Sequence, residues 1–312
     1  MNSPDLLTAI LASAVLAALP LILAGLGELV AERAGMMNLG VEGMMLTGAA
    51  VAFLTMVQTQ NFMLSVAAGA GAGLALSLVF AFCTVTLLAS QVPTGLAIMA
   101  LGTGLSSYIG KSLTASNVPT PSAFPIPILE HVPVVGPALF TLPIIGYLPF
   151  VMCGLLGWLL FRTRIGLLLN AVGESPVTAY QLGYSVNLVK YIAVLFGGAM
   201  AGLAGAYYSI GYVLLWQDGM TAGRGWMAIA LVLFSAWKPL RLVLGAILFG
   251  ATSALQFHAQ SMGMQIPSQF LACLPYVTTI AVLAYIAFRT ERHSDVPRSL
   301  GRTFHPLLNK LV

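Results

Sequence analysis

Long apolar runs, each bounded by a short polar, glycine-rich or proline-rich break, make up most of this 312-residue chain. A helix needs ~20 apolar residues to cross a hydrocarbon core about 30 Å thick. The pattern predicts spans near residues 6–30, 42–56, 62–89, 92–108, 145–161, 191–213, 226–237, 242–258 and 269–288. Two of these runs are short, so we expect about nine transmembrane helices, with a range of about eight to ten. The predicted fold is an all-α polytopic membrane protein in which some helices are discontinuous.

Composition agrees with this pattern and excludes a soluble protein. Hydrophobic residues make up 59% of the chain and charged residues 7%, and the mean hydropathy is +0.94. About a quarter of the residues of a typical soluble domain are charged. No charge-rich stretch is long enough to form a second unit, so residues 1–312 are expected to form one membrane domain.

The positions of the basic residues predict an orientation. Most of them gather in four places, namely Arg33, the loop with Arg162, Arg164 and Lys190, the turn with Lys238 and Arg241, and the tail from Arg289. With nine spans, all four places fall on one side of the membrane, and loops rich in Lys and Arg favour the cytoplasm. The carboxy terminus is therefore predicted to be cytoplasmic and the proline-rich loop at 114–142 external. The net charge of +4 belongs to these loops and does not indicate nucleic-acid binding.

Two polar breaks between apolar runs are the first candidate for function. They read "ERAGMMNLG" and "DGMTAGRG", and each precedes a short Met- or Ala-rich helix. Ionisable groups inside a membrane are costly, and paired breaks of this kind point to a substrate path built from discontinuous helices. The predicted pathway residues are Asn38, Glu42, Asp218 and Arg224. The alternative is that both breaks are surface loops whose charges lie among lipid headgroups.

The loop between the fifth and sixth predicted spans is the second candidate. In "GESPVTAYQLG", Ser175 suits a helix N-cap and Pro176 the first helical turn. The short helix is expected to run to about Leu182 and to end at Gly183. It is either an inert surface helix or a docking element for a soluble partner, with Glu174 and Gly183 as the residues that matter.

Several of these stretches resemble one family. "ERAGMMNLGVEGMMLTGA" is similar to the amino-terminal signature of nucleoside-type ABC transporter permeases, which belong to a wider group with ribose and branched-chain amino-acid permeases. "GESPVTAYQLGYSVNLVKYIAVLFGGAMAGLAGAYYSIG" resembles the family's cytoplasmic coupling segment and the following span. "GRGWMAIALVLFSAWKPLRLVLGAILFGATSALQ" resembles its carboxy-terminal block. The resemblance covers about residues 10 to 290, with one departure: "SAWKP" stands where the family usually has Gly before the aromatic residue.

The resemblance implies the permease subunit of an importer for nucleosides or related sugar-containing small molecules. It implies a second, often non-identical permease chain, a cytoplasmic ABC ATPase and an extracytoplasmic substrate-binding protein, in a bacterial cytoplasmic membrane. It also implies that Glu174 and Gly183 couple this chain to the ATPase. ATP would be used by that partner, so we expect no cofactor, catalytic residue or metal site in this chain, whose cysteines lie singly within apolar runs.

Two alternatives remain at this point. An ion-coupled secondary transporter would need membrane-embedded carboxylates, for which Glu28 and Glu42 are candidates. An ABC permease for simple sugars or branched-chain amino acids would keep the transporter class and change the cargo.

Overall fold

The computed structural model describes residues 3–113, 116–127, 130, 132, 135–261, 270, 273–274, 277–278, 280–281, 284 and 296–305. This part of the chain is helical, and its only extended pairing is an isolated bridge between Ala123 and Pro143. The α-helices are α1 (Ser3–Arg33), α2 (Val41–Thr59), α3 (Phe62–Ala81), α4 (Gln91–Gly110), α5 (Val135–Leu139), α6 (Leu148–Arg162), α7 (Arg164–Glu174), α8 (Pro176–Gln181), α9 (Val186–Tyr207), α10 (Arg224–Phe234) and α11 (Pro239–Ser261). Short π-helical turns, Phe82–Thr86 and Tyr208–Val213, extend α3 and α9, and a 3-10 turn, Ile144–Tyr147, precedes α6.

Seven helical segments of the described chain are long and apolar enough to cross a membrane. They correspond to the first six predicted spans and to the eighth. The predicted span at 226–237 is α10, an apolar helix of 11 residues that is too short to cross alone. Most of the predicted ninth span, 269–288, lies outside the described residues. The all-α polytopic fold is confirmed, whereas the count of nine is not.

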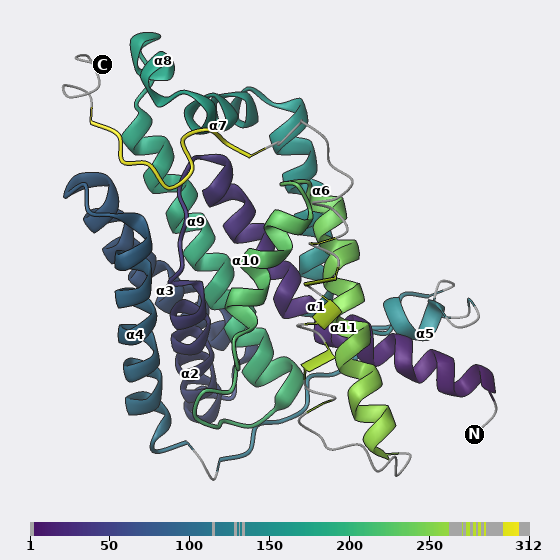
Figure 1. The fold of residues 1–312 in the computed structure, drawn as a ribbon. Coiled ribbons are helices and arrows are strands. Elements are labelled where there is room, and N and C mark those ends of the chain that lie inside the picture. The colour runs from purple at the N-terminus through teal and green to yellow at the C-terminus, as the bar shows by residue number, and fades with distance from the viewer. Residues whose placement is uncertain are drawn as a thin grey trace.

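Helix α1 is the centre of the bundle. It packs against α9, α10 and α11, and side chains such as Leu19, Ile22 and Leu26 are fully buried. A helix that is apolar on all sides is stable only where protein or lipid surrounds it. Figure 1 shows α1 crossing between the α2–α3–α4 group and the α6–α11 group.

Glycines let α2, α3 and α9 approach closely, as their four-residue spacing predicts. A β-carbon on Gly73 would collide with the carbonyl oxygen of Gly198, and one on Gly202 would collide with that of Gly69. Gly205 faces the carbonyl oxygen of Met45 in the same way. Backbone-to-backbone contact thus replaces side-chain packing along this seam.

One end of the bundle carries α7, α8 and the segment Val296–His305, and the opposite end carries the turn after α2 and the loop Leu214–Gly223 (Figure 1). At the α8 end, Arg33 donates to Asn170 of α7 and to the carbonyl oxygen of Trp237. Helix α7 corrects the prediction from the sequence, which placed residues 162–174 in a polar loop between two spans. Its buried Leu169 and Val172 face the bundle while Leu167 is exposed, so its folding depends on a tertiary neighbour.

Candidate translocation pathway and coupling site

The first polar break turns back into the bundle. Helix α1 ends at Arg33, residues 36–38 are non-helical, and α2 begins at Val41. The Asn38 side-chain oxygen accepts a hydrogen bond from the Gly40 backbone amide at 2.9 Å. The backbone amide of Asn38 donates to Glu28 Oε1 at 2.9 Å. An asparagine that bonds to backbone two residues ahead stabilises such a turn. Asn38 is 1% exposed, so lipid headgroups do not reach it.

Glu42 joins this break to the second one. Its carboxylate accepts from Thr221 Oγ1 at 2.6 Å and from the backbone amides of Gly223 at 2.8 Å and Gly225 at 2.6 Å. The first amides of a helix have no partner within the helix and carry partial positive charge. A carboxylate from α2 therefore caps α10. Gly225 permits the approach, since a β-carbon there would lie 2.6 Å from the Glu42 Cα.

Arg224 and Asp218 lie on the same loop but in different surroundings. The Arg224 guanidinium stands 4.5 Å from the centre of the Tyr208 ring and donates to the Thr221 carbonyl oxygen at 3.1 Å. Tyr208 in turn packs against Tyr212, with ring centres 5.7 Å apart. Stacking a cation on a ring is favourable, most of all where water is scarce. The two tyrosines were not among the predicted residues, although "AYYSIGY" directly before the break was their signal.

Asp218 is exposed and accepts a hydrogen bond from Ser107 of α4. The structure thus brings Glu42 and Arg224 to the start of α10 and places Asp218 farther out, against α4. Asn38 lies at the start of α2, next to α1. The assignment of these four residues to a substrate path stays a prediction. The headgroup alternative does not fit Asn38 and Glu42, because both side chains are buried within the chain.

Two further carboxylates, one helical turn apart on α1, hold the backbone around the breaks. Glu28 binds the Asn38 amide, and Glu32 Oε2 accepts from the Trp237 indole nitrogen at 2.7 Å. Trp237 and Ala236 both have positive φ, 56° and 49°. A positive φ is uncommon for residues other than glycine. Glu32 and Arg33 hold the turn after α10 in place, through the indole nitrogen and carbonyl oxygen of Trp237.

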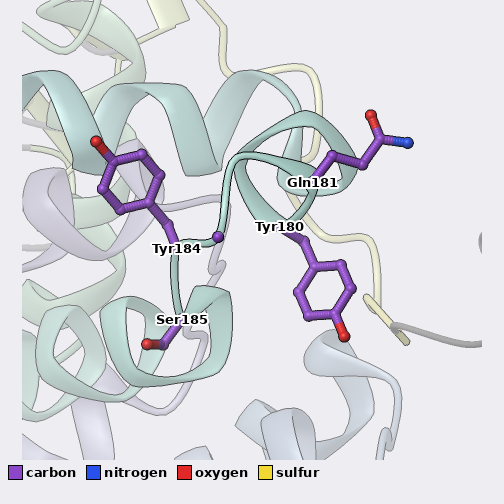
Figure 2. Close-up of a pocket in the computed structure, with 5 residues that line it drawn as sticks. Tyr180, Gln181, Tyr184 and Ser185 are labelled. Carbon is purple, nitrogen blue, oxygen red and sulfur yellow. The ribbon is translucent and has the colours of Figure 1, made fainter.

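The short helix predicted to end at Gly183 is present as α8, while its coupling role stays a prediction. Ser175 Oγ accepts from the Thr178 amide at 3.3 Å, Pro176 opens α8, and Gly183 has a φ of +87°. Glu174 ends α7 with a side chain that is 54% exposed. Figure 2 shows Tyr180 and Gln181 projecting away from each other at the end of α8. Both residues line a hollow of about 640 Å³. Leu182, 71% exposed, adds an apolar side chain next to it.

Helices that break inside a membrane bundle are typical of transporters. Residues 10–283 match the family described as the branched-chain amino acid transport system permease component. The match spans most of the chain, and the chain belongs to this family. It is thus a permease component of an ABC transporter, and the ion-coupled secondary transporter is no longer an alternative.

Its relatives differ in cargo. The chain is 40% identical to a putative glucose ABC transporter permease of Haloferax volcanii, over 95% of this chain and 97% of the relative. It is 32% identical to a nucleoside ABC transporter permease of Lactococcus lactis, over 91% and 94% of the two chains. It is 29% identical to a guanosine ABC transporter permease of Bacillus subtilis, over 96% and 98%. A second glucose permease of Haloferax volcanii is 28% identical over 74% of this chain and 65% of the relative.

Proposed function

We propose that this chain is one permease subunit of an importer that moves nucleosides or related sugar-containing small molecules across a bacterial cytoplasmic membrane. A second permease chain forms the path with it, a cytoplasmic ATPase drives it, and an extracytoplasmic binding protein delivers the substrate. The main support is the meeting of the two helix breaks at Glu42. Motion imposed on α10 changes the position of α2 through these three bonds.

The chemistry around the breaks suits a neutral substrate rich in hydroxyl groups. Such a molecule needs donors, acceptors and aromatic faces, and no strong opposite charge. The hydrogen-bonded pair of Ser107 and Asp218 offers a hydroxyl and a carboxylate to such a substrate. Arg224, which stacks on the Tyr208 ring, offers a hydrogen-bond donor beside an aromatic face. In this proposal, Asn38 and Glu42 hold the walls of the path, while Asp218 and Arg224 lie closer to the substrate.

The choice of cargo is tested by uptake of radiolabelled substrates into cells that express the whole complex. We expect saturable uptake of a purine nucleoside that excess unlabelled nucleoside abolishes and excess leucine does not. A sugar such as glucose is the second candidate, favoured by the 40% identity to the Haloferax relative. Uptake of glucose without nucleoside would select that candidate. Uptake of leucine alone would contradict both.

Arg33, α7 and the segment Val296–His305 gather at one end of the bundle, which supports a proposal for the orientation. We propose that this end is cytoplasmic. In a variant that lacks Cys83, Cys153 and Cys273, we expect Ser116→Cys to react with an impermeant thiol reagent in intact cells and Thr303→Cys to react only after lysis. Reaction of both from outside would refute the orientation. The tail residues 306–312 lie outside the described residues.

The coupling role of α8 is tested at Gly183. A β-carbon at this glycine meets no atom within 4 Å, so Gly183→Trp places an indole on the proposed docking surface without a clash inside the chain. We expect a folded complex whose ATPase activity no longer responds to the loaded binding protein. Gly183→Asn is the matched control, because Asn tolerates a positive φ and adds little bulk. Normal stimulation of the tryptophan variant would show that α8 is an inert surface helix.

A further inference from the structure

The segment Val296–His305, which we call the carboxy-terminal strap, is bound to the coupling site at Ser299 and Phe304. The Ser299 amide and hydroxyl both donate to the Gly173 carbonyl oxygen of α7, at 2.9 and 2.6 Å. Phe304 is buried in a small separate core with Val172, Ala179 and Val186. These contacts fix the strap to α7, α8 and the start of α9.

The same strap contacts the first polar break. A β-carbon on Gly35 would collide with the Ser299 hydroxyl. Gln91, at the start of α4, donates to the Arg302 carbonyl oxygen at 3.3 Å and accepts from the Met37 amide at 2.7 Å. The strap therefore lies between α8 and the connection from α1 to α2. Figure 1 shows its path across this end of the bundle, in yellow.

A hollow of about 400 Å³ opens between the strap and the turn from α7 to α8. Arg298, Arg302 and Phe304 line one side, and Glu174 and Pro176 the other. Arg298 lies 3.7 Å from Glu174, but their side chains are 86% and 54% exposed, and such exposed pairs add little stability. Two arginines against one glutamate leave an excess of positive charge in the hollow.

We infer that the strap is a second docking element for the ATPase, in addition to α8, and that an acidic side chain of the ATPase enters this hollow beside Arg298 and Arg302. The inference rests on the proposed function, in which an ATPase binds at this end. It also supplies a direct connection to the pathway. A displacement of the strap is transmitted to Gly35 by Ser299, and to Gln91 by Arg302. Neither route passes along α9.

The test uses the complete complex of both permeases, ATPase and binding protein. We expect Arg298→Glu with Arg302→Glu to weaken copurification of the ATPase at least about tenfold, as for charge pairs within an interface. The wild-type complex should lose ATPase as salt is raised, and the variant should lose this salt dependence. Arg241→Glu is the matched control, because it reverses an exposed charge at the start of α11. It should bind the ATPase normally.

The outcomes separate this inference from the proposed function. If the wild-type chain retains no ATPase, the proposed function fails. If the wild-type and the double variant retain it equally, the strap is not a docking element while α8 keeps its role. An equal loss with Arg241→Glu would also overturn the inference. Where the double variant does not assemble with its partner permease, Arg302→Glu alone carries the test. If changing an acidic residue of the ATPase to lysine restores its binding to the double variant, the contact is confirmed.

Discussion

Replacing Glu42 by alanine is expected to reduce substrate uptake roughly 100-fold, because it removes about 3 kcal/mol or more from the start of α10. Three donors, Thr221 Oγ1 and the amides of Gly223 and Gly225, lose their acceptor inside the bundle. Helix α10 then loses its fixed position against α2. The measurement is uptake by the whole complex, together with protease cleavage in the loop Leu214–Gly223 of the purified complex.

Glu42→Gln is the matched control. Its amide oxygen can still accept two of the bonds, but its NH₂ group faces the Gly225 amide, so we expect intermediate uptake and intermediate cleavage. This series distinguishes a positioning role from direct substrate contact. If uptake falls in the alanine variant while cleavage in the loop stays at the wild-type level, Glu42 acts on the substrate. Wild-type uptake in both variants would show that neither role matters.

Replacing Gly73 by leucine is expected to eliminate folded permease. The leucine β-carbon would collide with the Gly198 carbonyl oxygen and lie 2.7 Å from the Gly202 amide nitrogen. Backbone cannot move aside as a flexible side chain can, so α3 and α9 must separate along the whole seam. Even modest overpacking of a core costs about 1–3 kcal/mol. The amount of monodisperse protein after detergent extraction, measured by size-exclusion chromatography, checks this.

Gly71→Leu provides the control, two residues away on the same helix. A β-carbon at Gly71 meets no atom within 4 Å, so this variant should be extracted at the wild-type level. Equal yields of the two variants would contradict the close packing of α3 on α9. A loss of both would indicate that insertion of α3, and not its packing, limits the yield.

Features that depend on neighbours within a few residues were predictable. The apolar runs gave the helices, since the length of an apolar run is a property of the chain alone. Ser175, Pro176 and Gly183 defined α8, because caps and turns act on the backbone next to them. The four-residue spacing of Gly69 and Gly73 is also a local signal, typical of a close helix contact, although it does not identify α9 as the partner.

Other features required the packed chain. Helix α7 has 11 residues, too few to be stable alone, and it folds because the bundle covers one side of it. The sequence also could not show that the strap crosses α7 and reaches Gly35.

The sequence by itself determined that this protein is a helical membrane permease and where its two helix breaks lie, because hydropathy and backbone preference are local properties. Only the tertiary structure decided what Glu42 does there. It is 183 residues from Gly225, and their contact exists because α10 packs directly against α2 and α1. Hydrogen bonds between such distant residues are set by helix packing, which no local pattern in the chain records.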